Sequence, residues 1–521
     1  MHSFAIILAS LLLLAALATV LVHVLNSLPT LANRTHTTAF TDTQDTRLGQ
    51  ATSRQAAEHP RASGIYALPN ALEAFAARIL LARAAERSLD IQYYIWRKDM
   101  TGTMLFDALR AAADRGVRVR LLLDDNKTSG LDAILAALDS HPNIEVRLFN
   151  PFVVRWPRLI GYVTDFSRLN RRMHNKSFTA DNQATIIGGR NIGDEYFDAV
   201  AEGSLMFADL DVLAAGPVVA SVSNDFDKYW ASGSAYPAER LLQPVDARKM
   251  ARLTEAAAMI EADPAATSYV TAVRDTPLAQ DLREGSVPFE WVPTRMVSDE
   301  PAKGLGRGAP EGMLMHKLRE ITGAPETELE LVSPYFVPTA AGVEAFTSMA
   351  NEGVHIRILV NSLEATDIDV VHSGYAKRRE ALLAAGIELY EMRLLPSEAG
   401  DDRRSAGSFG SGASSLHAKT FSTDRKQVFI GSFNFDPRSA NLNTELGFII
   451  RSPALAQRLA ELFDNVIPAV AYEVHRSDSG ELYWTEQIDG RLVRHDTEPR
   501  TSMLQRAAVA FMSVLPIEWL L

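Results

Sequence analysis

The sequence contains no cysteine. This absence excludes disulfides, thiolate metal sites, thiol nucleophiles and a lipid-modified N-terminal cysteine. An excess of positive charge is also missing, since 52 Lys and Arg stand against 64 Asp and Glu, a net charge of −12. Such a balance gives no general attraction to nucleic acid, so we expect no nucleic-acid partner. The 521 residues, 47% of them hydrophobic, are enough for two or three folded domains.

Charged residues are absent from the stretch between Phe4 and Leu25. This apolar run is long enough for a helix across the hydrocarbon core of a bilayer, which takes about 20 residues. We predict a retained membrane anchor at residues 1–28, followed by a tether at 29–63 that is rich in Thr, Gln and Ala. The alternative is a cleaved signal peptide, although the first residues carry no Lys or Arg.

One motif occurs twice in the chain, as HNKSFTADNQATIIGGRN from residue 174 and as HAKTFSTDRKQVFIGSFN from residue 417. Both copies read His, any residue, Lys, four residues, Asp, six residues, Gly, a small residue, one more and Asn. Two similar hairpins without chemistry are the alternative interpretation, but five matched positions at one spacing disfavour it. The fixed positions are His174, Lys176, Asp181, Gly188 and Asn191, then His417, Lys419, Asp424, Gly431 and Asn434.

The repeat extends beyond the motif to a whole domain. The strand-like run LDIQYYIW at 89–96 matches LELVSPYF at 329–336, and IEVRLF at 144–149 matches IELYEM at 387–392. The same 243 residues separate Ile144 from Ile387 and His174 from His417. Strands that alternate with helices favour a parallel α/β sheet. We therefore predict two duplicated α/β domains at 64–235 and 310–475, an inter-domain region at 236–309 and a tail at 476–521.

The motif residues suit the cleavage and transfer of a phosphodiester. A neutral imidazole is a nucleophile or base near pH 7, and a charged one is a general acid. Lysine and asparagine can bind the non-bridging oxygens of a phosphate. If the two copies face each other, one His can attack phosphorus while the other protonates the leaving oxygen. Lysine is not a usual metal ligand and no His/carboxylate cluster has metal-site spacing, so we expect neither a metal nor another cofactor.

The paired motifs resemble those of the phospholipase D superfamily. The runs NIGDEYF at 191–197, NFDPRSANLNTE at 434–445, SLHAK at 415–419 and LPIEWLL at 515–521 are similar to bacterial cardiolipin synthases of the C-type group. The resemblance implies two phospholipase-D-like α/β sandwich domains that face each other across a pseudo-two-fold, with an N-terminal transmembrane helix. It also implies a protein of the bacterial inner membrane that acts on phospholipids.

The activity implied by the resemblance is transfer of a phosphatidyl group from one phospholipid to phosphatidylglycerol, through a phosphohistidine. The donor is either phosphatidylglycerol or phosphatidylethanolamine. Hydrolysis of a phospholipid or a nucleic acid, with water as the acceptor, is the alternative. A membrane-bound scaffold with a dead site is disfavoured because both motifs are intact.

The resemblance also assigns roles to residues. It makes His174 the nucleophile and His417 the acid and base, with Lys176 and Lys419 in the catalytic set. Asp181 and Asp424 belong to the same set as supports rather than reacting groups. Asn191 and Asn434 would bind the phosphate, while Glu195 and Glu445 would orient the two imidazoles.

Some neighbouring residues have two interpretations each. Arg171 and Arg172 could hold a lipid phosphate or lie on a solvated surface. Tyr93, Tyr94 and Tyr335 could line the site or pack in the core. The Gly/Ser-rich stretch at 397–415 could be a surface loop or a lid over the site, and the apolar end at 503–521 could pack on a domain or lie in a membrane interface.

Overall fold

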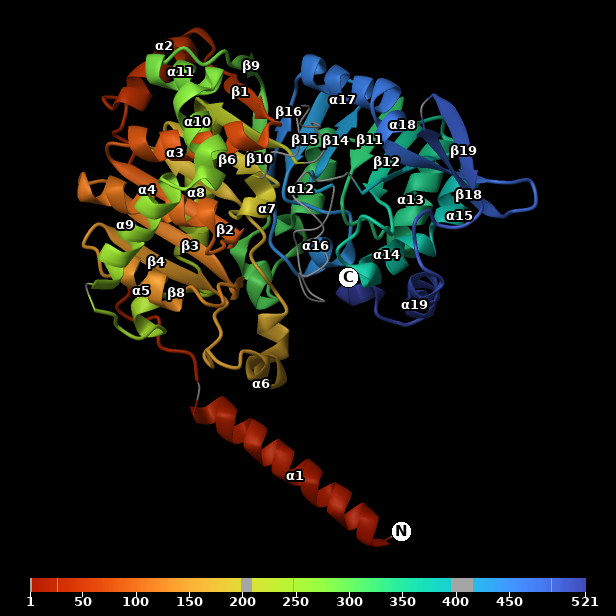
Figure 1. Ribbon diagram of the computed structural model, residues 1–521, viewed down its shortest axis with the longest axis horizontal. Helices are drawn as coiled ribbons and strands as arrows, with labels where there is room; N and C mark the ends of the chain where they lie inside the picture. Colours follow the sequence, from red (N-terminus) through yellow and green to blue (C-terminus); the bar gives the residue numbers. More distant parts are fainter. Residues whose placement is uncertain (1, 26, 198–208, 247, 395–415, 489) are drawn as a thin grey trace.

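The chain folds into two α/β halves that lie side by side, each built on one mixed sheet (Figure 1). The computed structural model describes residues 2–25, 27–197, 209–246, 248–394, 416–488 and 490–521. The predicted loop or lid at 397–415 lies outside the described residues.

The first half contains a nine-stranded sheet in the order β8-β4-β3-β2-β5-β6-β7-β1-β9. Strands β2, β3 and β4 run parallel, and the other neighbours pair antiparallel. The strands are β1 (Ser63–Leu68), β2 (Ser88–Ile95), β3 (Arg118–Lys127), β4 (Ile144–Phe149), β5 (Ser177–Ala180), β6 (Ala184–Gly188), β7 (Asp211–Ala215), β8 (Ala235–Pro237) and β9 (Glu290–Val292).

The second half contains a ten-stranded sheet in the order β10-β16-β15-β14-β11-β12-β13-β17-β18-β19. Here β11, β12 and β13 run parallel. The strands are β10 (Thr294–Ser298), β11 (Glu328–Val332), β12 (His355–Asn361), β13 (Glu388–Met392), β14 (Thr420–Thr423), β15 (Gln427–Gly431), β16 (Leu446–Ile450), β17 (Ala471–Arg476), β18 (Leu482–Ile488) and β19 (Arg491–His495).

The two sheets confirm the predicted duplication. Six strands, β4-β3-β2-β5-β6-β7, have the same order and the same directions as β13-β12-β11-β14-β15-β16. Only three strands of each set are parallel, however. The two motif strands form an antiparallel hairpin in each half, because the short turn between them cannot make the crossover that a parallel pair needs.

Helices cover the first sheet on both faces. On one face lie α3 (Ala71–Ala84), α4 (Met100–Asp114) and α5 (Asp132–Asp139), with α9 (Arg248–Glu261), α10 (Thr267–Asp275) and α11 (Pro277–Glu284) packed outside them. Side-chain caps define where several of these helices begin. Asn70 accepts from the backbone of Glu73 at the start of α3, and Asp99 accepts from Gly102 at the start of α4.

The second sheet is covered in the same way. One face packs against α12 (Leu314–Thr322), α13 (Thr339–Asn351), α14 (Asp369–Ala376) and α15 (Arg379–Ala384). The remaining helices are α16 (Pro437–Asn441), α17 (Pro453–Asn465), α18 (Ile467–Val470) and α19 (Met503–Ser513).

The halves share one apolar core. Helix α8 (Pro217–Trp230) follows β7 in the first half, and α17 follows β16 at the equivalent place in the second. Both helices contribute to a single buried cluster that also contains Ile187 and Leu210 of the first half and Ile430 and Phe448 of the second. Apolar burial of this kind stabilises the contact of the halves.

The segments between and beside the sheets also join them. In the expected tether at 29–63, the Arg34 guanidinium donates to the carbonyl of Ser232 at 2.6 Å and α2 (Arg47–Glu58) lies on the first half. The expected inter-domain region at 236–309 is divided at Pro293, since β9 pairs with β1 and β10 pairs with β16. The expected tail at 476–521 contains β18, β19 and α19.

Helix α1 (His2–Leu25) projects away from the body of the protein (Figure 1). Its apolar side chains between Phe4 and Val22 are largely exposed. Across the described ranges it is the one helix that is long and apolar enough to cross a membrane.

The motif aspartates hold the far end of each hairpin. Asp181 and Asp424 adopt left-handed backbone conformations, with φ of 51° and 53°. Asp181 accepts backbone hydrogen bonds at 2.7–3.0 Å from the three residues 86–88 that lead into β2. Asp424 accepts from residues 326–328 at 2.7–3.1 Å, at the start of β11. Because each Asp follows its strand and the motif His precedes it, the aspartates brace the sheet at a distance from the imidazoles.

We expect Asp181→Ala to destabilise the protein by about 3 kcal/mol, because it leaves the buried Ser88 N–H and two part-buried N–H groups without an acceptor. Asp424 is only partly buried. Water can replace its carboxylate, so Asp424→Ala should cost about 1 kcal/mol. Differential scanning calorimetry of the full chain in detergent measures both losses. Equal unfolding temperatures for Asp181→Ala and the parent would contradict the bracing role.

Candidate active site

Each motif histidine is paired with a carboxylate from the other half of the chain. His174 precedes β5 in the first half, and its Nδ1 lies 2.8 Å from Oε2 of Glu445 in the second. His417 precedes β14 in the second half, and its Nδ1 lies 2.7 Å from Oδ2 of Asp209 in the first. All four side chains are largely or fully buried. When Nδ1–H donates to a carboxylate, Nε2 keeps the lone pair, so each pair fixes which nitrogen can react.

A backbone contact between the halves sets up the first of these pairs. The His174 N–H donates to the Thr444 carbonyl at 2.8 Å, and the Thr444 N–H donates to the Arg172 carbonyl at 2.9 Å. The Thr444 hydroxyl also donates to the Asn175 amide oxygen at 2.9 Å. Glu445 directly follows Thr444, so this short parallel bridge places its carboxylate beside His174.

Glu195 does not orient an imidazole, contrary to our expectation. Its carboxylate forms an ion pair with Arg97, at 3.0 Å from Nε. The sheet register explains the error. Gly188 of β6 pairs with Asp211, and Gly431 of β15 pairs with Gly447, so the equivalent of Glu445 is the residue two before Asp211. That residue is Asp209.

A sequence signal for Asp209 existed. The string ADLDVL at 208–213 resembles TELGFI at 444–449, with an acidic residue and Leu just before an apolar strand. The connection from the motif Gly to this strand is longer in the first half, and fixed spacing therefore missed the match.

The small residue after the motif Gly differs between the halves for a steric reason. A Cβ at Gly189 would overlap the Asp209 carboxylate, whose Cγ would lie 3.2 Å away. At the equivalent place, the Ser432 hydroxyl donates to Oε2 of Glu445 at 2.5 Å. Aspartate is one methylene shorter than glutamate, so its carboxylate lies closer to the backbone. The first half thus combines Gly with Asp, and the second combines Ser with Glu.

The motif glycines themselves lie under the next strand. A Cβ at Gly188 would lie 2.6 Å from the Cα of Asp211, and one at Gly431 would lie 2.6 Å from the Cα of Gly447. Since real Cβ atoms do not approach so closely, only glycine fits at either position.

The motif lysines fold back on the backbone of their own histidines. Lys176 Nζ donates to the His174 carbonyl at 2.7 Å, and Lys419 Nζ donates to the His417 carbonyl. Each ammonium retains further protons for a ligand. The Asn191 amide oxygen accepts from the Ile95 N–H at 3.2 Å, which leaves its NH2 group as the end that can donate.

Burial controls protonation of the first pair. Desolvation, reinforced by the nearby Lys176 and Lys419, lowers the pKa of His174 well below its usual value. Burial also raises the pKa of Glu445 to about 7, against the opposing effects of Lys176 and the Ser432 hydrogen bond. The His174 imidazole is therefore neutral near pH 7, and its carboxylate partner titrates in that range.

In the second pair the carboxyl group is the strongly ionised member. Burial and Lys419 lower the pKa of His417 to about 4, while Asp209 opposes this shift. Burial works against ionisation of Asp209, but His417, Arg190 and Lys419 outweigh it and lower the pKa of its carboxyl below the usual value. Burial lowers the pKa of Lys419 to about 8. Asp209 is thus a firm anion that can stabilise an imidazolium at His417.

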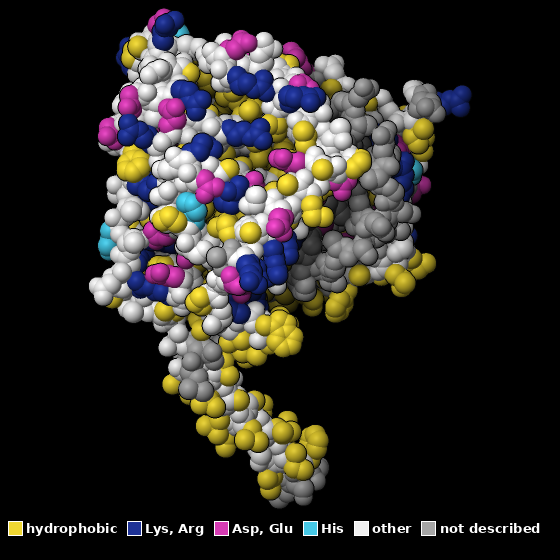
Figure 2. Space-filling model, turned by 60° about the vertical axis from the view of Figure 1, so that its left-hand side comes forward, with side chains coloured by type: hydrophobic (Ala, Val, Ile, Leu, Met, Phe, Trp, Pro, Cys, Tyr) yellow, Lys and Arg dark blue, Asp and Glu magenta, His cyan; other side chains and the backbone are white. Residues whose placement is uncertain are grey.

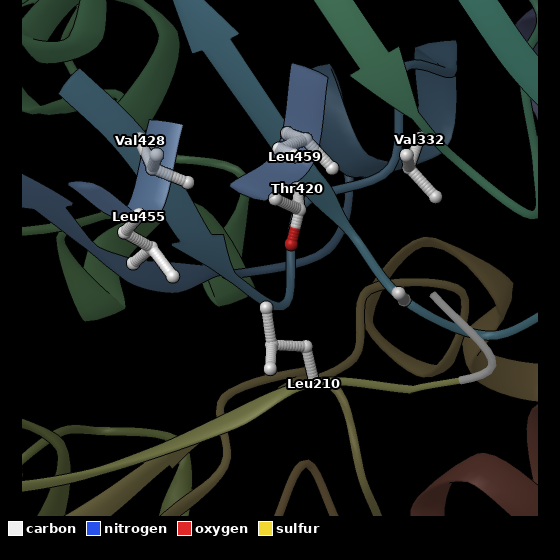
Figure 3. A pocket seen from close by; sticks show the side chains of 7 residues that line it. Leu210, Val332, Thr420, Val428, Leu455 and Leu459 are labelled. Carbon is white, nitrogen blue, oxygen red and sulfur yellow. The ribbon is translucent and has the colours of Figure 1, made fainter. Parts of the chain in front are cut away.

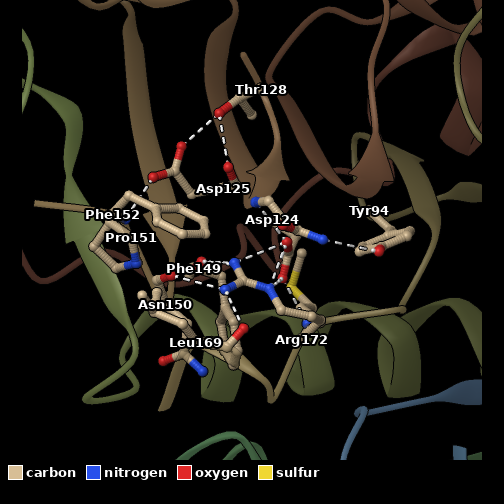
Figure 4. Close-up of polar contacts among 12 residues, drawn as sticks. Tyr94, Asp124, Asp125, Thr128, Phe149, Asn150, Pro151, Phe152, Leu169 and Arg172 are labelled. Atoms are coloured by element: carbon tan, nitrogen blue, oxygen red, sulfur yellow. Dashed lines mark hydrogen bonds and ion pairs between the residues drawn. The ribbon is translucent and has the colours of Figure 1, made fainter. Parts of the chain in front are cut away.

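Arg172 is a structural residue rather than a phosphate ligand or a solvated side chain (Figure 4). Its guanidinium pairs with Asp124 at 2.8 Å and donates to the carbonyls of Phe149, Leu169 and Asn150. Asp124 in turn accepts from the Met173 N–H at 2.8 Å, one residue before His174. This network fixes the chain that enters the motif. Arg171 donates to the Ser167 carbonyl.

Aromatic rings flank both imidazoles. The Tyr94 ring meets His174 edge to face at 5.1 Å, and the Tyr196 ring meets His417 in the same way at 5.3 Å. Tyr93 belongs instead to the core, where its fully buried hydroxyl accepts from Arg78. Tyr335 donates to Asp367 at 2.8 Å. Sequence patterns did not single out Tyr196.

Leu210 anchors Asp209 in the second half. Figure 3 shows its side chain reaching toward Thr420, Leu459 and Val332 of that half, around a small apolar hollow. Ala418, between the motif His and Lys, lines the same hollow. Asp209, which carries the carboxylate, therefore directly precedes Leu210, which packs against apolar side chains of the second half.

Within the described part of the chain, no group of three or more His, Asp or Glu side chains could hold a metal ion. The cations that affect the pKa of the imidazoles most are the two motif lysines.

Comparisons with known proteins identify the family. A family model described as cardiolipin synthase, PLD-like domain, matches residues 79–230 and 318–467. The chain is 48% identical to cardiolipin synthase C of Escherichia coli (strain K12), over 91% of this chain and 100% of that protein. It is 24% identical to cardiolipin synthase B of the same strain, over 79% of this chain and 82% of that one.

A solved structure has the same fold. The phosphatidylserine synthase of Haemophilus influenzae Rd KW20 matches with a TM-score of 0.54 at 14% identity, over 90% of this chain and 99% of that one. With both halves of the chain matched by the family model, the protein belongs to the family of cardiolipin synthases with phospholipase-D-like domains.

Proposed function

We propose that this protein transfers a phosphatidyl group from one phospholipid to a hydroxyl of phosphatidylglycerol, which makes cardiolipin. The single observation that carries the proposal is that His174 and His417 are each paired with a carboxylate from the other half of the chain. It leaves two buried imidazoles, each with a reactive Nε2, beside two lysines that suit a phosphate. The donor is phosphatidylglycerol or phosphatidylethanolamine, and the same chemistry with water as acceptor would be hydrolysis.

In the first step, Nε2 of His174 attacks phosphorus and the bond to the donor headgroup oxygen breaks. His417 gives its Nε2 proton to that oxygen, and the headgroup alcohol leaves. The product is a phosphatidyl group bound to His174 through a P–N bond. Lys176 and Lys419 stabilise the charge on the non-bridging oxygens, with Asn191 and Asn434 as further donors.

In the second step, His417 takes the proton from a hydroxyl of the acceptor. The acceptor oxygen attacks phosphorus, and the bond to His174 breaks. His174 is thereby neutral again, and His417 holds the proton needed for the next cycle. No net proton or electron is consumed.

The electrostatics of the pairs support this division of roles. Burial lowers the pKa of His174 well below its usual value and raises the pKa of its partner Glu445 to about 7, which favours a neutral nucleophile. His417 faces a firmly ionised Asp209, which raises the pKa of this imidazole against the effects of burial and Lys419. A bound anionic phosphodiester raises the pKa of both imidazoles from these lowered values, so that His417 can carry the proton it must donate.

The same proposal places the protein in the bacterial inner membrane through α1. The exposed apolar helix from Phe4 to Val22 supports an anchor because it has the length of one membrane span. Phospholipid substrates are then available in the bilayer that holds the enzyme.

The central test uses the purified full chain in phosphatidylglycerol nanodiscs, with and without phosphatidylethanolamine. We expect labelled cardiolipin from the parent and none from His174→Ala or His417→Ala, because each lacks a reacting group. Asp209→Asn should lower kcat by roughly 100-fold to 10,000-fold, because an amide no longer fixes the tautomer of His417. Phosphatidic acid as the sole product would contradict transfer.

Glu195→Gln is the matched control. Its carboxylate pairs with Arg97 and not with an imidazole, so kcat should stay within a few-fold of the parent. A loss as large as that of Asp209→Asn would contradict the assignment of Asp209 as the partner of His417.

A second prediction swaps the two carboxylate arrangements. Gly189→Ser should lower kcat by at least about tenfold, because the new side chain displaces the Asp209 carboxylate. The double change Gly189→Ser with Asp209→Glu copies Ser432 and Glu445 of the second half and should recover most of the loss. Measured kcat values give the coupling between the two positions, and purely additive effects would argue against the steric account.

The pH dependence follows from Glu445 and Lys419. Below about pH 7, protonation of Glu445 removes the anion that accepts Nδ1–H of His174, so kcat/KM should fall. Above about pH 8, loss of the Lys419 charge should lower it again. Ser432→Ala removes a hydrogen bond that lowers the pKa of Glu445 and should move the acidic limb upward. An acidic limb that stays in place would rule out Glu445 as its source.

A further inference from the structure

Two exposed apolar segments lie at one edge of the protein. The first is α6 (Leu159–Leu169) with the residue stretch before it, where Trp156, Leu159 and Val163 are 88%, 76% and 72% exposed. Soluble surfaces rarely leave several large apolar side chains together in water. The acidic residue of this segment, Asp165, is neutralised by Arg168 at 2.6 Å.

The second segment is α19 with the end of the chain. Leu504, Val514 and Trp519 are 82%, 76% and 59% exposed. Its acidic residue, Glu518, is paired with Lys377 and Arg378 at 3.2 Å and 3.0 Å. Most of the exposed large apolar side chains outside α1, among the residues described, lie in these two segments.

Both segments lie on the side from which α1 leaves the body. Figure 1 places α6 and α19 at its lower edge, with α1 extending below them. Figure 2 shows hydrophobic side chains along the same edge, beside the end of α1 that joins the body. Three apolar elements that are far apart in the sequence are thus turned toward one region of space.

The side of α6 that carries Tyr162 is connected to the active site through hydrogen bonds. The Tyr162 hydroxyl donates to the Asn126 amide oxygen at 2.9 Å, and the Asn126 amide donates to the Tyr94 hydroxyl at 3.3 Å. The Tyr94 ring contacts His174. Two hydrogen bonds and one ring contact therefore connect the exposed helix to the first imidazole.

The C-terminal segment reaches the site from the other side. Gln505 of α19 donates to Asp369, in the same segment as Asp367, the acceptor of Tyr335. The Leu521 carbonyl accepts from the Arg438 N–H at 2.7 Å. The Arg438 guanidinium donates in turn to Asn170, four residues before His174.

We propose that α6 and α19 form a docking surface for the lipid bilayer that α1 enters, so that the active site opens toward this bilayer between them. The occupant is the interfacial region of a phospholipid membrane, where exposed Trp, Phe and Leu side chains are buried at the level of the headgroups. The inference rests on the proposed membrane anchor and deepens it. Phospholipid phosphates then reach His174 and His417 with their acyl chains still in the membrane.

The absence of cysteine makes the test direct, because single labels can be introduced into the full chain. Val163→Cys and Val514→Cys probe the two segments, and Leu12→Cys probes α1. Met259→Cys is the matched control, since Met259 is 74% exposed but lies on α9, away from the lower edge in Figure 1. Each variant carries an environment-sensitive fluorophore in phosphatidylglycerol and phosphatidylethanolamine nanodiscs that contain nitroxide-labelled lipids.

We expect the lipid quencher to reduce emission several-fold more at Val163→Cys, Val514→Cys and Leu12→Cys than at Met259→Cys, which aqueous iodide should quench instead. If Val163→Cys or Val514→Cys behaves like Met259→Cys while Leu12→Cys lies in lipid, the docking surface is wrong and the anchor stands. If Leu12→Cys is also quenched from water, the anchor fails and the docking surface fails with it.

Discussion

Each histidine of the site depends on a carboxylate from the other half of the chain. The contacts between the halves hold both histidine–carboxylate pairs in place. The shared core of α8 and α17, the backbone bridge at Thr444 and the packing of Leu210 all hold the halves in the one register that makes both pairs. An imidazole or carboxylate buried without its partner costs several kcal/mol, about 3–5 for a broken buried ion pair. Docking of the halves and assembly of the site are therefore one event.

Burial works against the charged form of every member of the two pairs. It favours neutral imidazoles, and at Glu445 it also favours the neutral acid. The lysines add positive charge to the same closed space, which further disfavours an imidazolium until an anion arrives. The site is thus electrostatically incomplete alone, and a phosphodiester supplies the missing negative charge.

Motif spacing predicted the duplication and the strands, and the family resemblance assigned Glu445 to an imidazole without saying which one; the structure pairs it with His174. Motif spacing could not predict the partner of His417, because the longer connection in the first half moved Asp209 out of the spacing. The family resemblance assigned the role of carboxylate partner to Glu195, but the Glu195 carboxylate instead forms an ion pair with Arg97. Sequence periodicity also does not show which buried cation pairs with which carboxylate. From the sequence, Arg172 was therefore interpreted as a surface residue or a phosphate ligand, whereas the structure pairs it with Asp124.

The difference between Gly189 with Asp209 and Ser432 with Glu445 bears on the history of the chain. Pairs in which each histidine takes its carboxylate from the other half can be formed by two identical copies. Related by a true two-fold axis, each copy would supply the carboxylate for the histidine of the other. A homodimer must keep its two carboxylate arrangements the same, because one gene encodes both. Fusion of the copies removes that constraint, and here the two arrangements have diverged in a compensated way, with each small residue matched to the length of its own acid. In a symmetric ancestor either imidazole could attack, depending on the orientation of the bound substrate, whereas a fused chain can give each imidazole a fixed role.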